Sequence, residues 1–315
     1  MIVDLFGNNV EYNEVEYVNI YADEIQQVKN IVTGEEWLYT AAIYEKINKP
    51  VLPDLINYRY RKDLQNWENY VDQNNENVHW VDIRGNKNKK YIIDRWLDYI
   101  LKDCDPNKRN FNFSILGINT SNLNLDEFGE NQVFNNIYNR FFRSMLQFSL
   151  KKFFNRGVVV KSIYHEDGQQ STHSYFNWHT VLKLDYDEDL NFCCDSIEFL
   201  PKSHRDDKRS NVIQLCDVLL GIFKDLHLGV EKNYCLDKKD IISSRFTQEL
   251  LIKRIIREPN NKNSSYGYSN RFHVSLFPKI KSDPGSIVRS MNNYYDISKI
   301  DLSYEYNLNQ CKLIL

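Results

Sequence analysis

The sequence predicts an α/β protein in which helices flank a mixed sheet, with an insertion after the second strand and a C-terminal extension. Two observations lead to this fold class. Residues 16–24 alternate apolar and polar side chains with the period of a β-strand. In the second half of the chain, strand-like runs alternate with helix-like runs, which is the pattern of a sheet with helices packed on it.

The first half of the predicted fold contains three strands and the insertion. A turn at 33–36 joins the first strand to a returning strand, which makes a hairpin. The expected elements, in chain order, are strand 16–24, strand 37–44, a helical region 52–70, a strand-like piece 78–83, a basic loop 84–90, an amphipathic helix 91–101 and strand 111–118. The insertion then occupies about residues 48–105.

The second half supplies the longest helix and the most β-prone strand. The expected elements are a helix 130–154 with an apolar stripe, strand 158–164, a partly helical piece 173–184, strand 196–200 and helix 211–226. Beyond them we expect a helix 243–257 and a strand 272–277. The domain organisation that follows is a main domain over 1–236 and an α+β extension packed on it over 237–315.

Composition excludes few functions, but it indicates the compartment in which the protein is expected. The formal net charge of −3 is too small to indicate a partner. The six cysteines form no C-x-x-C pair, which argues against zinc-knuckle and thioredoxin-like sites. The chain begins without a basic, apolar leader, and no apolar run approaches membrane-spanning length. We therefore expect a soluble, reduced, cytoplasmic protein without membrane association.

One acid stands out inside the most apolar helix. Gln214, Asp217 and Gly221 fall on one stripe of helix 211–226, and the other sides of the helix are apolar. A lone carboxylate in such a setting costs several kcal/mol unless it is protonated, hydrogen-bonded or paired with a cation. Gly221 leaves room for another group to approach. The alternative is a structural aspartate that is bonded to backbone.

Acids from three separate elements are candidates for one metal site. The first strand ends at Asp23 and Glu24, the strand at 158–164 leads to Glu166 and Asp167, and Asp217 lies on the final helix. Carboxylates that are brought together repel one another, and a divalent cation is the simplest remedy. Two such cations about 4 Å apart organise the hydrolysis of a phosphodiester. Mg²⁺ or Mn²⁺ is the predicted cofactor.

Several short motifs, taken in order, resemble a known family. They are "YADE" at 21–24, "VHWVDI" at 78–83, "IYHEDG" at 163–168, "PKSHR" at 201–205 and "IQLCDVLLG" at 213–221. This order is similar to the bacterial and phage family called domain of unknown function thirty-eight hundred, over about residues 16–223. The resemblance implies a ribonuclease H-like fold. Ile25 stands where members of the family usually carry serine.

The resemblance also implies which acids hold the metal. Its first-strand acid is Asp23, its central-strand acid is Glu166 or Asp167, and its final-helix acid is Asp217. Asp82 is a fourth candidate, and Glu130 at the start of the long helix is an alternative to it.

Basic and histidine side chains provide candidate contacts to a nucleic acid. His204 is a candidate for proton transfer, and Arg205 for contact with a scissile phosphate. Lys87 and Lys89 of the basic loop are candidates for gripping other phosphates. The alternative for His204 and Arg205 is an ordinary solvated loop, which the sequence slightly favours, and for Lys87 and Lys89 it is a solvated hairpin or the lead-in to a helix.

The functional hypothesis is a nuclease or related phosphoryl-transfer enzyme that depends on a divalent metal and acts on nucleic acid. The alternative is an inactive ribonuclease H-like module that binds nucleic acid or protein, with phage or mobile-element defence as its setting. Ile25 favours the alternative.

Overall fold

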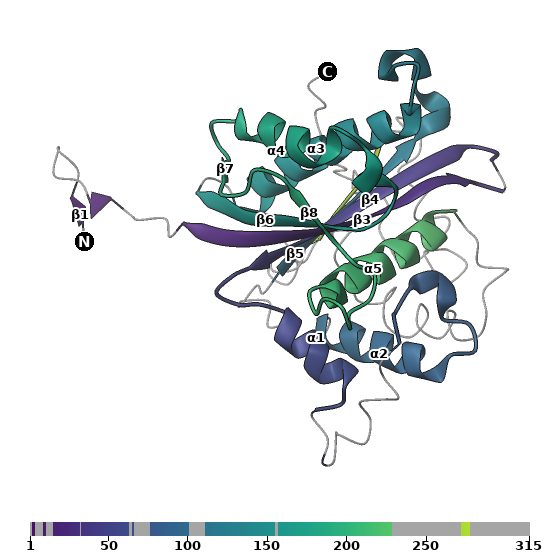
Figure 1. Cartoon of the computed structure of the whole chain (residues 1–315), viewed down its shortest axis with the longest axis vertical. Coiled ribbons are helices and arrows are strands. Elements are labelled where there is room, and N and C mark those ends of the chain that lie inside the picture. Colours follow the sequence, from purple (N-terminus) through teal and green to yellow (C-terminus); the bar gives the residue numbers. More distant parts are fainter. Residues whose placement is uncertain are drawn as a thin grey trace, which may run out of the picture.

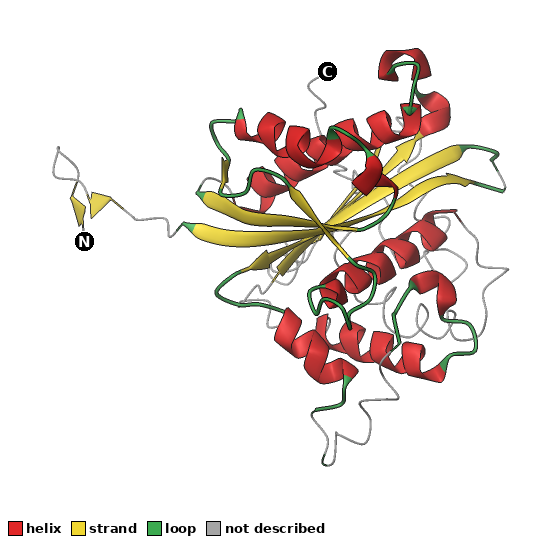
Figure 2. Cartoon of the chain, viewed as in Figure 1, coloured by secondary structure: helices red, strands yellow, loops and turns green. Residues whose placement is uncertain are grey.

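A seven-stranded mixed sheet forms the centre of the molecule (Figures 1 and 2). The computed structural model describes residues 2–3, 9–10, 15–31, 33–62, 65, 76–100, 111–154, 157–228 and 272–277. The strands of the sheet are β3 (Glu16–Lys29), β4 (Glu36–Lys46), β5 (Phe111–Asn119), β6 (Val158–Glu166), β7 (Asn191–Phe192), β8 (Ile197–Leu200) and β9 (Phe272–Phe277). A separate two-stranded piece pairs β1 (Ile2–Val3) with β2 (Asn9–Val10).

The strand order is that of a ribonuclease H-like α/β fold. The path through the sheet is β7-β6-β3-β4-β5-β9, and β8 also pairs with β6. β3, β4 and β5 form an antiparallel meander, whereas β6 runs parallel to β3 and β8 runs parallel to β6. The predicted mixed sheet is therefore confirmed. β3 lies at its centre, between β4 and β6.

Helices cover both faces of the sheet. They are α1 (Leu52–Arg59), α2 (Lys87–Asp98), α3 (Val133–Phe154), α4 (Phe176–Asp185) and α5 (Ser210–Leu228). α3 and α4 lie on one face, and α5 lies on the other face with α1 and α2 of the insertion stacked beyond it (Figure 1). Short 3-10 turns join these elements: η2 (Trp80–Asp82), η4 (Thr120–Asn122), η5 (Leu125–Phe128) and η6 (Gln169–Thr172).

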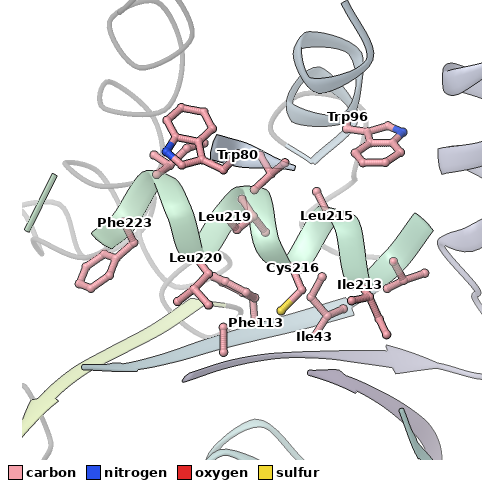
Figure 3. Close-up of a cluster of buried hydrophobic side chains, with 14 of the residues drawn as sticks. Ile43, Trp80, Trp96, Phe113, Ile213, Leu215, Cys216, Leu219, Leu220 and Phe223 are labelled. Carbon is pink, nitrogen blue, oxygen red and sulfur yellow. The ribbon is translucent and has the colours of Figure 1, made fainter. Parts of the chain in front are cut away.

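α5 is apolar on nearly every side because the sheet covers one side of the helix and the insertion covers the opposite side. Cys216 and Leu220 point toward the sheet, where they meet side chains such as Phe113 (Figure 3). Trp80 packs over the opposite side of the helix. Cys216 is a small core residue, since none of its surface is exposed. The insertion is thus part of the hydrophobic core.

Two local predictions within the insertion are wrong. Residues 78–83 form no strand; their centre is the 3-10 turn η2, which the packing of Trp80 on α5 holds in place. The basic stretch 84–90 is not wholly a loop either. α2 already begins at Lys87, because the Asn86 side chain accepts a hydrogen bond from the Lys89 backbone N–H and caps the helix.

The strand expected at 272–277 is confirmed, and it belongs to the main sheet. β9 pairs in parallel with β5 at the edge of the sheet. Gly117 of β5 makes room for this arrangement, because a Cβ there would lie 2.7 Å from the Leu276 side chain. The helix expected at 243–257 lies outside the described residues. Of the helices that the structure describes, none has the length and apolar character needed to cross a membrane.

Candidate functional site

The candidate site lies where the parallel strands β3 and β6 bring two acids side by side. Ala22 of β3 is paired with His165 of β6, so Asp23 and Glu166 follow that pair on neighbouring strands. The expectation that the first strand ends at Asp23 and Glu24 is wrong, because β3 continues to Lys29. Asp23 is therefore held within a strand that neighbours pair on both sides, which is a rigid position for a functional group.

The alternation of the strands decides which acids face one another. Tyr21 and Tyr164 belong to the core on the α5 side, so Asp23 and Glu166, two residues further on, point to the same side. Glu24 points to the opposite face, toward α3. Asp167 follows the end of β6 and is exposed. Asp23 and Glu166 thus lie on the face of the sheet that α5 with Asp217 covers, whereas Glu24 lies on the other face and Asp167 is exposed.

Asp23 is the most buried of the three acids, with 4% of its surface exposed. Its pKa is raised well above the ordinary value, first by burial and then by the negative charges of Glu166, Asp217 and Glu24. A hydrogen bond from the Glu24 backbone N–H to Asp23 Oδ1, 2.8 Å long, acts in the opposite direction. The charges of Glu166 and Asp217 therefore act on Asp23 across the same face of the sheet.

Two basic side chains lie next to the other two acids. Lys202 Nζ lies 3.3 Å from the Glu166 carboxylate, although burial still raises the pKa of Glu166. His79 Nδ1 lies 3.7 Å from Asp217 Oδ2, and the interaction with Asp217 is the main reason that the pKa of His79 is raised. The sequence did not predict that His79 and Lys202 contact these acids, since nothing in their spacing relates them to residues far along the chain.

Asp217 is also bonded to backbone. The Trp80 N–H donates a 2.7 Å hydrogen bond to Asp217 Oδ2. The alternative named for Asp217, a structural aspartate that is bonded to backbone, is therefore supported by this hydrogen bond. The stripe that was predicted on α5 is real: Gln214 accepts a hydrogen bond from the Val78 N–H, and Gly221 lies against Trp80. The group that approaches Gly221 is a protein side chain, not a ligand.

Glu24 takes part in a buried network on the other face of the sheet. Its carboxylate lies 3.0 Å from His165 Nε2, and the Tyr138 hydroxyl lies 2.7 Å from the same nitrogen. His165 is completely buried, and although burial lowers its pKa, the charge and hydrogen bond of Glu24 together with the neighbouring Glu166 raise the pKa above its ordinary value. These contacts explain the position of Glu24 without a metal.

The remaining acidic candidates are more exposed. The Asp82 side chain is 52% exposed and pairs with Lys89 at 3.7 Å. Glu130 is exposed and precedes α3. Within the described ranges, no three His, Cys, Asp or Glu side chains are already arranged as a metal-binding group. Asp23, Glu166 and Asp217 would have to reorient their side chains to share a cation.

The remaining candidates are one buried histidine and three basic side chains of the insertion and of the loop before α5. His204 is fully buried, and its Nδ1 lies 3.2 Å from Asn77 Oδ1. Burial and the neighbouring Arg59 lower the pKa of His204 to about 3, so it is neutral near pH 7. Such a position favours a structural role over contact with a phosphate. Lys87 and Lys89 lie in the first turn of α2, and Arg205 is exposed in the loop before α5.

No known family model matches the chain, and no curated protein matches it. The class of protein is therefore defined by the fold and the site alone. It is a ribonuclease H-like α/β protein in which three acids from β3, β6 and α5 lie in one electrostatically coupled cluster.

Replacing Asp23 by asparagine is expected to stabilise the metal-free protein. A carboxyl group whose pKa is raised by folding binds more protons in the folded state, so stability falls as pH rises from the unfolded pKa of about 3.9 to the folded one. The asparagine side chain would keep an acceptor for the Glu24 N–H and would remove this decrease of stability with rising pH. Thermal unfolding in EDTA, at about pH 5 and about pH 8, checks the prediction. A lower midpoint for Asp23→Asn than for wild type at the higher pH would contradict it.

Proposed function

We propose that the protein is a nuclease or related phosphoryl-transfer enzyme that depends on Mg²⁺ or Mn²⁺ and acts on nucleic acid. The observation that carries the proposal is the coupling of Asp23, Glu166 and Asp217, in which burial and mutual repulsion disfavour three negative charges without a cation. Keeping such a cluster is destabilising in itself. A bound divalent cation would turn the repulsion into attraction.

The residues fit such a cation in kind. All three donors are carboxylates, which are the oxygen ligands that hard divalent cations prefer. They come from two paired strands and a packed helix, so their backbones are held rigidly. Lys202 occupies part of this space, but its side chain is 57% exposed and is able to turn toward solvent. Asp23, Glu166 and Asp217 are the residues that would hold the metal.

A bound divalent cation would supply an activated water and neutralise the charge that develops on the leaving oxygen. The chain contributes position and charge. The Trp80 N–H and His79 orient Asp217, and Lys202 carries a positive charge at the rim of the cluster, next to where a phosphate must approach. Buried Asp23 has the lowest exposure and fixes the bottom of the site.

Thermal unfolding with and without Mn²⁺ tests the proposal. A cation that binds only the folded state, at a concentration one hundred times its Kd, stabilises by about 2.7 kcal/mol. For a chain of 315 residues we therefore expect a rise of about 4 °C in the midpoint. Asp217→Asn should abolish the rise. Asp82→Asn is the matched control, because it makes the same charge change nearby at an exposed side chain, and it should keep the rise.

Nuclease assays complete the test. Wild-type protein is incubated with Mn²⁺ and single-stranded DNA, duplex DNA, RNA or an RNA–DNA hybrid, beside Asp217→Asn and Asp82→Asn. Cleavage that requires Mn²⁺ and is lost only in Asp217→Asn would support the nuclease. If Mn²⁺ stabilises neither wild type nor variants, the metal site is refuted. The inactive binding module, which the replacement of a family serine by Ile25 favours, then becomes the better hypothesis.

A further inference from the structure

A polar cavity lies beside the acidic cluster. It has a volume of about 340 Å³ and is lined by Glu76, Asn77, Lys89, Ser203 and Arg205. One wall comes from the insertion, which contributes the segment before η2 and the first turn of α2. The other wall is the loop between β8 and α5. The cavity therefore forms only when the insertion packs against α5.

Its walls are direct neighbours of the groups that contact the acids. Asn77 is two residues from His79, which meets Asp217, and Ser203 follows Lys202, which meets Glu166. Gln214 joins the two walls: its Nε2 donates to the Lys202 carbonyl at 2.9 Å and lies 3.5 Å from Asn77 Oδ1. Gln214 is one helical turn from Asp217. The cavity and the acidic cluster are therefore next to each other along α5.

The cavity carries the opposite charge balance from the cluster. Lys89 and Arg205 contribute two positive charges, and Glu76 contributes one negative charge. The Lys89 side chain is only 15% exposed, and its carboxylate neighbour Asp82 is 3.7 Å away and half exposed, so this ion pair is weak. The Glu76 carboxylate accepts a hydrogen bond from the Asn86 side chain. The Ser203 hydroxyl and the Asn77 amide add uncharged polar groups to the lining.

We propose that this cavity binds a backbone phosphate of the nucleic-acid strand, next to the phosphodiester that reaches the acidic cluster. The inference rests on the proposed function and deepens it. Charge-assisted hydrogen bonds from lysine and arginine are the usual means of holding a phosphate. Because the acids repel a strand until a cation is bound, a separate cationic contact holds the strand in register beside them. The ligand is a phosphodiester of DNA or RNA.

Fluorescence anisotropy in EDTA measures the binding without cleavage. The probes are labelled oligothymidylate and oligouridylate, titrated with wild type, Lys89→Gln and Arg205→Gln. We expect each substitution to weaken binding about tenfold and to lower the salt slope by about 0.7 for a single strand. Glu76→Gln should strengthen binding, since it removes the one negative charge of the lining. A merely structural role for these side chains would not predict opposite effects of opposite charges.

Lys183→Gln is the matched control. Lys183 is an exposed lysine on α4, on the other face of the sheet, so its removal should leave affinity and salt slope unchanged. If Lys183→Gln weakens binding as much as Lys89→Gln, or if wild type binds neither oligonucleotide, the proposal is overturned. Competition by inorganic phosphate at the same phosphate concentration would also overturn it, because the site would then recognise the free anion.

The failure of this inference is distinguishable from failure of the proposed function. Lys89→Gln and Arg205→Gln should keep the full Mn²⁺-dependent rise in unfolding midpoint, since neither residue belongs to the acidic cluster. That rise also demonstrates that both variants are folded. Conversely, Asp217→Asn should lose the Mn²⁺ effect and still bind the oligonucleotides. If Lys89→Gln and Arg205→Gln lose both the Mn²⁺-dependent rise in midpoint and oligonucleotide binding, the result would contradict a separate phosphate site.

Discussion

Arg59→Met is expected to lower the free energy of unfolding by about 2–4 kcal/mol. Arg59 is fully buried at the end of α1, and burial lowers its pKa to about 9, so the side chain remains charged near neutral pH. It donates hydrogen bonds to Asn211 Oδ1, Gln214 Oε1 and the Glu76 carbonyl, each 2.5–2.6 Å long. Methionine would keep the apolar stem and leave these acceptors with fewer donors.

The loss should also reach the candidate site. Arg59 and the Val78 N–H share Gln214 Oε1, so Arg59 helps to hold the segment that carries His79 and Trp80 against α5. Urea-induced unfolding measures the change in stability. Arg84→Met is the control, because Arg84 is exposed in the same insertion, and it should shift stability by no more than about 0.5 kcal/mol. Equal effects of the two substitutions would argue against a structural role for Arg59.

Gly221→Ala is expected to destabilise the protein by about 3 kcal/mol, although alanine normally favours a helix over glycine by about 1 kcal/mol. A Cβ at position 221 would lie 2.4 Å from two atoms of the Trp80 side chain and 2.6 Å from a third. Trp80 is unable to move freely, because it is 1% exposed and its Nε1 donates a 2.6 Å hydrogen bond to Asp225. Figure 3 shows its ring lying over α5.

A double-mutant cycle isolates the clash. In a Trp80→Ala background the ring is gone, so adding Gly221→Ala should change the unfolding free energy little or raise it by the helix preference of alanine. A large and equal loss from Gly221→Ala in both backgrounds would show that the cause is not contact with Trp80. The same variants should weaken Mn²⁺ stabilisation, since the Trp80 backbone N–H orients Asp217.

Local patterns in the sequence predicted most of the sheet and the long helices. The alternation around Val18 and Ile20 identified β3, and the apolar spacing through Phe141 and Met145 identified α3, because these periods follow directly from strand and helix geometry. The prediction was wrong at η2, where Trp80 resembles a strand residue in sequence. Its turn conformation comes from packing against Gly221, which lies far away along the chain.

The candidate acids could be predicted only in part. Asp217 stood out because an acid in an apolar helix requires a partner, and Asp23 stood out beside a buried strand. Its neighbour Glu24 was equally plausible, and so were both Glu166 and Asp167. The sequence holds no information on which of two adjacent strand residues faces the helix that carries Asp217, since that depends on the side from which the helix packs.

The sequence by itself determined the elements, the binary pattern of both faces of the sheet and a short set of acids. Only the tertiary structure decided which acids meet, that His79 and Lys202 accompany them, and that Lys89 and Arg205 share a cavity. The physical reason is the distance along the chain over which each interaction acts. Side-chain period and the hydrogen bonds within a helix or turn relate near neighbours, whereas packing, charge interactions and hydrogen bonds between elements join residues more than one hundred positions apart, as between Trp80 and Asp217.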